Sequence, residues 1–395
     1  MLNKNSFKIE IWLGLFIVFL LVAGISILNL STTQEMDNNE IINGEDVLSL
    51  SKDELLDKTT QSTGTNNILQ NNGQTQTQAP IIKPAKPSFP QFKEIVNPAG
   101  FVNADNITIG EFIGKKIVLI DFLTYSCINC QRTFPYINAW HDKYNNEGLQ
   151  IIGIHTPEFA IEKNSEHVRE AMQKYGIKHP IVLDNTYSTW NAYGNNYWPR
   201  KYLIDINGNI VYDHIGEGAY AQTEMKIQEL LRERQTKIGS NSSVSNINKT
   251  LTPIDPQISL AKSPEIYFGA FRNSDFQNGT KNKTGIQSLS APQNSDLIKN
   301  KLYLNGEWNI ENEYSENNSA GAKILFKYEA KDVFFVAGAE SDIKIKILKD
   351  GALIDTQTIK NHTLYHLIKD ATGGVHTLEI IIESPGLRAY TFTFG

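Results

Sequence analysis

Residues 116–130 read Lys-Ile-Val-Leu-Ile-Asp-Phe-Leu-Thr-Tyr-Ser-Cys-Ile-Asn-Cys. The first eight residues form a short apolar run rich in β-branched side chains, which is typical of a buried central strand. The cysteines follow at Cys127 and Cys130, and a helix is expected from about Cys127 to Tyr144. A Cys-x-x-Cys pair placed between a strand and a helix indicates redox chemistry.

The position of the two cysteines predicts different roles for them. The free N–H groups at a helix N-terminus favour a thiolate, so Cys127 is expected to be exposed and nucleophilic. Cys130, one turn into the helix, is expected to be shielded and to resolve a mixed disulfide. The alternatives are a structural disulfide or a zinc half-site. A zinc site needs two further ligands, and the eight histidines are scattered, so we expect no metal and no bound cofactor.

The sequence on either side of this pair alternates between strand and helix patterns. Asn207-Gly208 between two apolar runs is a strong hairpin signal. Strand, helix, strand and helix followed by a hairpin and a helix predict an α/β domain with a mixed sheet and helices on both faces. The expected elements after the first helix are strands at 150–155 and 181–184, a helix at 165–175, hairpin strands at 201–204 and 209–213, and a closing helix at 223–234.

Composition excludes several classes of protein. The chain has 395 residues and a formal net charge of -6, which argues against a general nucleic-acid binder. Two cysteines are too few for a disulfide-stapled framework or a four-cysteine metal site.

An apolar N-terminal segment predicts the compartment. Residues 11–30 carry no charge, and twenty helical residues span about 30 Å, the thickness of a bilayer core. Lys4 and Lys8 precede the segment, so the positive-inside rule places residues 1–10 in the cytoplasm and the bulk of the chain outside it, as a single-pass membrane protein. The alternative is a signal peptide cleaved near residue 24. Both interpretations make most of the chain extracytoplasmic.

The remaining chain divides by composition. Residues 31–91 are rich in Asn, Gln, Thr and Pro and are expected to form a disordered tether, because they cannot bury enough apolar surface to order themselves. The α/β domain is placed at 92–234 and a second polar linker at 235–262. Residues 263–395 contain many short strand-like runs separated by turn signals, which favours an all-β sandwich of the jelly-roll type.

Several residues around the cysteines resemble the thioredoxin superfamily. Asp121 lies six residues before Cys127, where thioredoxins keep a buried acid, and Pro135 lies five residues after Cys130, where they have a helix-kinking proline. Trp198-Pro199 precedes a strand, where they place a cis-proline beside the active-site sulfurs. The resemblance implies a thioredoxin fold and thiol–disulfide exchange.

The insert between Tyr144 and Pro180 resembles the membrane-anchored TlpA- and ResA-like branch, and Glu158 matches the acid that this branch positions near its cysteines. Residues 124–130 and 155–159 are similar to the C-terminal region of the DipZ proteins, and that similarity extends into the β-rich segment, over about 90–395. DipZ proteins carry a multi-helix electron-transferring membrane domain in front of this region, whereas this chain has one apolar segment. The resemblance therefore implies a separate, CcdA-like membrane electron donor.

These resemblances imply roles for individual residues and partners. Asp121 is expected to help move the proton of Cys130, with Glu158 as a further acid, while Pro199, Trp198 and Tyr125 line the substrate site. The expected activity is the reduction of disulfides in exported proteins, for example during cytochrome c maturation. The alternatives are an oxidase or isomerase, a thiol peroxidase suggested by the Thr124-to-Cys127 spacing, and a surface carbohydrate-binding protein. In the last case Trp308, Tyr303 and Tyr314 either stack on a sugar or pack in the core.

Overall fold

The computed structural model describes residues 88–239 and 261–395, which we call the α/β domain and the β-domain. Both belong to one compact unit, Pro84–Gly395. The expected membrane segment at 11–30 and nearly all of the expected tether lie outside the described residues. Within the described parts, no helix combines the length and the apolar character that a membrane crossing needs.

The α/β domain is built on a six-stranded mixed sheet with the order β1-β4-β3-β2-β5-β6. β2 pairs in parallel with β3, and β3 with β4, whereas β1, β5 and β6 pair antiparallel to their neighbours. The strands are β1 (Gly100–Val102), β2 (Ile117–Leu123), β3 (Leu149–His155), β4 (Ile181–Leu183), β5 (Arg200–Ile204) and β6 (Ile210–Ile215). The helices are α1 (Ile128–Tyr144), α2 (Ser165–Lys174), α3 (Ser188–Ala192) and α4 (Tyr220–Ile238), with 3₁₀ turns η1 (Gly110–Phe112) and η2 (Ala160–Lys163).

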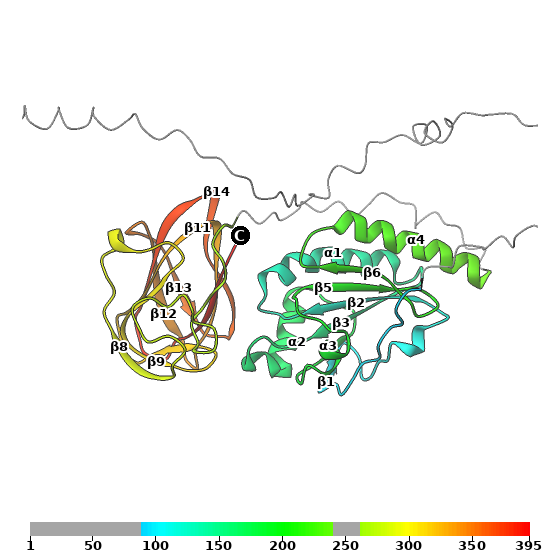
Figure 1. Cartoon of the computed structure of the whole chain (residues 1–395), viewed down its shortest axis with the longest axis horizontal. Coiled ribbons are helices and arrows are strands. Elements are labelled where there is room, and N and C mark those ends of the chain that lie inside the picture. The colour runs from blue at the N-terminus through cyan, green and yellow to red at the C-terminus, as the bar shows by residue number, and fades with distance from the viewer. Residues whose placement is uncertain (1–87, 240–260) are drawn as a thin grey trace, which may run out of the picture. The chain divides into compact units, whose positions relative to one another are not determined.

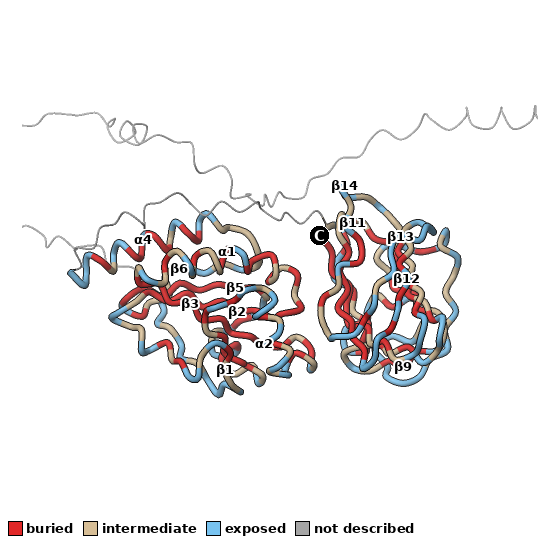
Figure 2. Tube along the Cα trace, turned by 180° about the vertical axis from the view of Figure 1, so that it is seen from behind, coloured by how far each residue is buried: buried red, intermediate tan, exposed pale blue. Residues whose placement is uncertain are grey.

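Alternate residues of β2 enter two different apolar clusters, because successive side chains of a strand point to opposite faces. On one face, Ile117 and Leu119 pack with residues of α1 and α4. On the other face, Val118 and Ile120 pack with α3 and with the segment before β1. All seven residues of β2 are buried, and Figure 2 shows the central strands as the buried layer of the domain. The expected mixed sheet covered on both faces is confirmed (Figure 1).

The β-domain is all-β, as expected, and its nine strands belong to one continuous sheet rather than to two separate ones. Strand β11 pairs with β14 along one edge, while its other edge pairs first with β9 and then with β15. β15 also pairs with β10 and β10 with β9, while β13 and β8 lie at the two ends of the strand order. The strands are β7 (Ile266–Tyr267), β8 (Gly285–Leu289), β9 (Leu302–Ile310), β10 (Ser315–Asn317), β11 (Ala322–Gly338), β12 (Ile343–Lys349), β13 (Ala352–Ile359), β14 (Thr363–Ile382) and β15 (Arg388–Phe394), with the 3₁₀ turn η3 (Asn294–Asp296) before β9.

The interior of the β-domain is a core of aliphatic and aromatic side chains. Trp308 is fully buried in it, and Tyr303 is 4% exposed in a neighbouring cluster. For these two residues the core alternative is confirmed, so they offer no platform on which a sugar ring can stack. Tyr314 is partly buried against Tyr390, with their ring centroids 5.3 Å apart.

The two domains share an apolar cluster. Ile128 of α1 and Phe159 pack with Tyr390 and other residues of β11, β14 and β15. Hydrogen bonds flank this cluster: the Tyr125 hydroxyl donates to the His362 carbonyl over 3.2 Å, and the Ala160 amide donates to Glu313 Oε2 over 2.7 Å. Burying an aliphatic or aromatic side chain of this size contributes roughly 1.5–3 kcal/mol. The β-domain therefore packs directly against the segment that contains the cysteines.

Candidate active site

The two cysteines lie at the start of α1, which follows the C-terminal end of β2 after a four-residue link. Cys127 is the N-cap residue of the helix and is partly exposed, and Cys130 is fully buried one turn later. Both are free thiols. Burial, together with a hydrogen bond to Cys127, raises the pKa of Cys130 well above its usual value. One thiol is therefore accessible to a partner, and the other needs a proton acceptor before it can attack.

Asp121 is buried in β2 and lies opposite Lys201 of β5 in the antiparallel register. Its Oδ1 lies 3.9 Å from Lys201 Nζ, and neither atom has a hydrogen-bond partner among the described residues. Burial raises the pKa of Asp121 to about 6, and the charge of Lys201 partly offsets that rise. Burial lowers the pKa of Lys201, and the carboxylate opposes this change. Asp121 also interacts electrostatically with Cys130. Asp121 and Lys201 thus form a buried pair of opposite charges that interacts electrostatically with Cys130.

Trp198 and Pro199 are joined by a cis peptide bond immediately before β5. The Trp198 indole N–H donates to the Thr156 carbonyl over 3.0 Å, and its ring packs on Trp190 with centroids 4.3 Å apart. Cys127 and Trp198 both pack against the cluster that contains Cys130. The structure therefore brings Trp198 and the cysteine pair together, while the substrate-binding role of Trp198 and Pro199 stays a prediction.

Tyr125 lies deeper than a substrate-binding residue is expected to lie. Its side chain is 2% exposed, and its ring stacks on His155 with centroids 5.7 Å apart. Its hydroxyl is engaged by the β-domain at His362. A substrate can contact it only if the domains separate at this point. A substrate-contacting role for Tyr125 stays a prediction.

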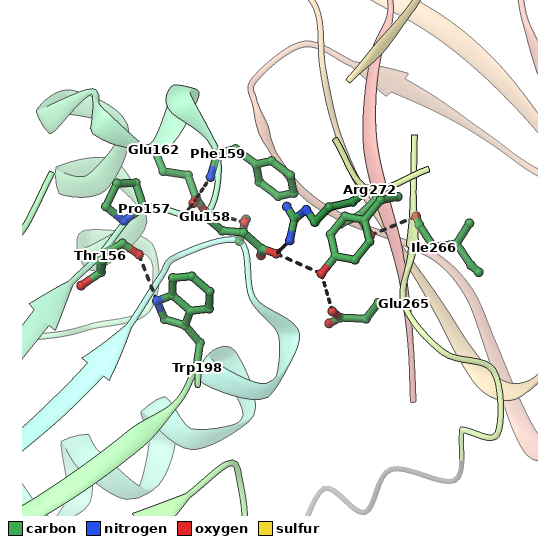
Figure 3. Close-up of polar contacts among 12 residues, drawn as sticks. Thr156, Pro157, Glu158, Phe159, Glu162, Trp198, Glu265, Ile266 and Arg272 are labelled. Carbon is green, nitrogen blue, oxygen red and sulfur yellow. Dashed lines mark hydrogen bonds and ion pairs between the residues drawn. The ribbon is translucent and has the colours of Figure 1, made fainter. Parts of the chain in front are cut away.

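The Glu158 side chain makes its described hydrogen bonds with residues of the β-domain. Its Oε1 accepts from the Tyr267 hydroxyl over 3.0 Å and from the Arg272 guanidinium over 2.7 Å (Figure 3). These contacts orient the carboxylate toward the junction of the domains. Its proposed action near the cysteines stays a prediction.

Glu162 in η2 is a buried acid that the sequence analysis missed. Its Oε1 accepts from the Ser126 hydroxyl over 2.5 Å, and its Oε2 accepts from the amides of Glu158 and Phe159 over 2.5 and 3.0 Å. Burial, and then the charge of Glu158, raise the pKa of Glu162 to about 7. Ser126 immediately precedes Cys127, so this carboxyl connects the cysteine loop to the segment that contacts the β-domain. The signal available in the sequence was an acid directly after the apolar residues Phe159, Ala160 and Ile161.

The raised pKa of Glu162 predicts a pH dependence of stability. A carboxyl whose pKa is higher in the folded chain contributes stability below its unfolded pKa and loses it as pH rises through the folded value. We expect the wild type to lose about 2 kcal/mol through this group between about pH 5 and 7, and Glu162→Gln to lack that loss. Urea unfolding of both proteins across this pH range measures the difference.

Glu166→Gln is the matched control, since Glu166 lies four residues later, in α2, and its side chain is 69% exposed. Its stability curve is expected to run parallel to that of the wild type. A Glu162→Gln curve that also runs parallel to the wild type would show that Glu162 does not titrate in this range.

Comparison with known families agrees with this geometry. Residues 84–230 match the Redoxin family model, and residues 263–395 match the model described as Thioredoxin like C-terminal domain. The thiol-disulfide oxidoreductase ResA of Bacillus thuringiensis is 30% identical over 136 residues, which cover 32% of this chain and 76% of that protein. The chain belongs to the thioredoxin-like thiol-disulfide oxidoreductases. The 136 residues matched to ResA are too few to cover both domains of this chain.

The match to a second relative is long enough to extend into both domains of this chain. Protein DipZ of Mycobacterium tuberculosis is 34% identical over 280 residues, which cover 71% of this chain and 39% of DipZ. The chain thus spans about two fifths of the length of the DipZ proteins. Among solved structures, the solution structure of a thioredoxin-like protein in the oxidised form is 25% identical, covers 37% of this chain and 97% of its own, and has a TM-score of 0.35.

Proposed function

We propose that this oxidoreductase transfers electrons through Cys127 and Cys130. The observation that carries the proposal is the asymmetry of the pair, because Cys127 is partly exposed at the N-terminus of α1 and Cys130 is buried. Burial raises the pKa of Cys130 and keeps its thiol protonated until it is needed. Attack and resolution are thereby assigned to different residues.

The reaction has two exchange steps. The Cys127 thiolate attacks one sulfur of a substrate disulfide, so that a Cys127–substrate bond forms and the substrate bond breaks. Cys130 then gives up its proton and attacks Cys127, which forms the Cys127–Cys130 disulfide and releases the reduced substrate. Two electrons pass from the dithiol to the substrate. The two thiolates released on the substrate then take up protons. Asp121 receives the proton of Cys130 and passes it on.

We further propose that the chain reduces disulfides of exported proteins from a membrane-anchored position. The apolar segment 11–30 and the flanking Lys4 and Lys8 support an anchor, and the similarity to ResA and DipZ supports a reductant. A membrane dithiol protein of the CcdA type would restore the reduced Cys127–Cys130 pair. Cytochrome c maturation is one process that needs such a reductant.

Substrate trapping tests the proposal. In Cys130→Ser the second exchange step is blocked, so mixed disulfides with Cys127 should accumulate in the host and be released by dithiothreitol. Non-reducing electrophoresis followed by mass spectrometry identifies the trapped proteins. If the variant traps a small set of exported proteins, that result would support a reductant with defined substrates.

Cys127→Ser/Cys130→Ser is the matched control, since it has the same fold and no thiol. Adducts that persist in this double variant are not thiol-linked. If Cys130→Ser yields no more adducts than the double variant, and if Cys127 alkylates no faster than a free thiol, the proposed mechanism is wrong.

A further inference from the structure

A pocket with a volume of about 260 Å³ lies where the α/β domain and the β-domain meet. Four aromatic side chains line it: Tyr187, Trp198, Tyr267 and Phe271. Phe271 is 70% exposed, so its apolar ring is accessible to a bound group. Aromatic walls of this kind bind flat or long aliphatic groups.

The pocket is formed by backbone that packs closely. Gly269 lies so near the 312–314 backbone that a Cβ at this position would come within 2.2 Å of the Glu313 carbonyl carbon. On the other side, Trp198 is fixed by its hydrogen bond to Thr156 and by its packing on Trp190. Trp198 also packs against the cluster that contains Cys127 and Cys130. A polypeptide bound at Cys127 would therefore reach the pocket along Trp198.

The charges of the pocket are unequal. Glu158 and Arg272 neutralise each other over 2.7 Å, and in Figure 3 the Glu158 side chain lies between Trp198 and Arg272. Glu313 also lines the pocket, and it forms no ion pair with any residue that the structure describes; its Oε2 accepts only the Ala160 amide. Glu265, which accepts from the Tyr267 hydroxyl over 2.6 Å, adds a further acid close by. The pocket therefore has an excess of negative charge beside aromatic walls.

We propose that this pocket binds a lysine or arginine side chain of the substrate polypeptide, close in sequence to the cysteine that Cys127 attacks. The aliphatic stem of such a side chain packs on Trp198 and Phe271, and its cation faces the Glu313 carboxylate. The proposal rests on the proposed function and adds a substrate preference to it. The β-domain thereby becomes part of the substrate site, since it supplies Glu313, Phe271 and Tyr267.

Peptides that carry a single cysteine as a 2-pyridyl disulfide test this assignment. Arg, Leu or Glu is scanned through the positions that flank the cysteine, and release of 2-thiopyridone by the 395-residue chain gives the second-order rate. At the best position we expect the Arg peptide to react about fivefold faster than the Leu peptide, and the Glu peptide to react more slowly than either. The advantage of Arg should shrink as ionic strength rises.

Glu313→Gln keeps an oxygen for the Ala160 amide and removes the charge, so the ratio of Arg to Leu rates should fall toward one. Glu307→Gln is the control, since Glu307 lies on β9 outside the pocket lining, and it should leave the ratio unchanged. Equal rates for all peptides, with rapid release of thiopyridone, would overturn the pocket assignment while leaving the proposed function intact. No release from any peptide would instead overturn the proposed function.

Discussion

Replacing Asp121 with Asn is expected to slow resolution of the mixed disulfide by about a hundredfold. Burial raises the pKa of Cys130, so its thiol cannot attack Cys127 until a neighbouring group accepts its proton. Asp121 has a pKa of about 6 and is ionised at neutral pH, and it interacts electrostatically with Cys130. Asparagine has nearly the same shape but cannot accept the proton.

Stopped-flow measurement of the two exchange steps separates this role from a general loss of activity. The first step depends on Cys127 and should be unchanged in Asp121→Asn, while the second step becomes slow. In the wild type the second step should speed up as pH rises through about 6, because Asp121 must be ionised to accept a proton, and the variant should lack this inflection.

Asp142→Asn is the control for this measurement, since Asp142 lies on α1, the helix that contains Cys130, and its side chain is 56% exposed. Its rates for both steps should match the wild type. If Asp121→Asn resolves the mixed disulfide as fast as Asp142→Asn does, Asp121 has no part in the proton transfer.

Local patterns in the sequence were enough to predict much of the α/β domain. The apolar run before Cys127, the hairpin at Asn207-Gly208 and the cis bond at Pro199 each depend on residues next to one another in the chain, and all three are present. β1 and α3 were not predicted: the three residues of β1 begin with a glycine, unlike the β-branched run of β4, and the five residues of α3 are too few to show a helical period. The change of partner along β11, from β9 to β15, was not predicted, because it depends on contacts between segments far apart in the chain.

The residues that complete the candidate site were harder to predict, since their roles arise from contacts between distant segments. In the sequence, nothing distinguishes Lys201 from other polar residues at the start of a strand. It lies opposite Asp121 only because of the pairing register of β2 with β5. Tyr125 and His362 are 237 positions apart, and no local pattern indicates their hydrogen bond. The sequence alone therefore predicts the thiol chemistry but not the way in which the β-domain covers it.

Lys201→Met is expected to lower the free energy of unfolding by about 4 kcal/mol at alkaline pH. Methionine fills a similar volume, so the main change is that Asp121 loses its counter-charge in a fully buried position. The charge of Lys201 holds the pKa of Asp121 down, and without it that pKa rises further above its unfolded value. A carboxyl with a raised folded pKa loses stability as pH rises, so the variant should be least stable at high pH and approach the wild type at about pH 5.

Two further variants make this measurement decisive. Asp121→Asn/Lys201→Met removes both members of the pair, and it should recover most of the lost stability, because no buried charge is left uncompensated. Lys178→Met removes a surface lysine whose side chain is 65% exposed and should change stability by less than about 0.5 kcal/mol. Urea unfolding at several pH values compares all of them. If Lys201→Met were as stable as Lys178→Met at alkaline pH, Lys201 would not stabilise the ionised Asp121, and the pair would have to be uncharged in the folded chain.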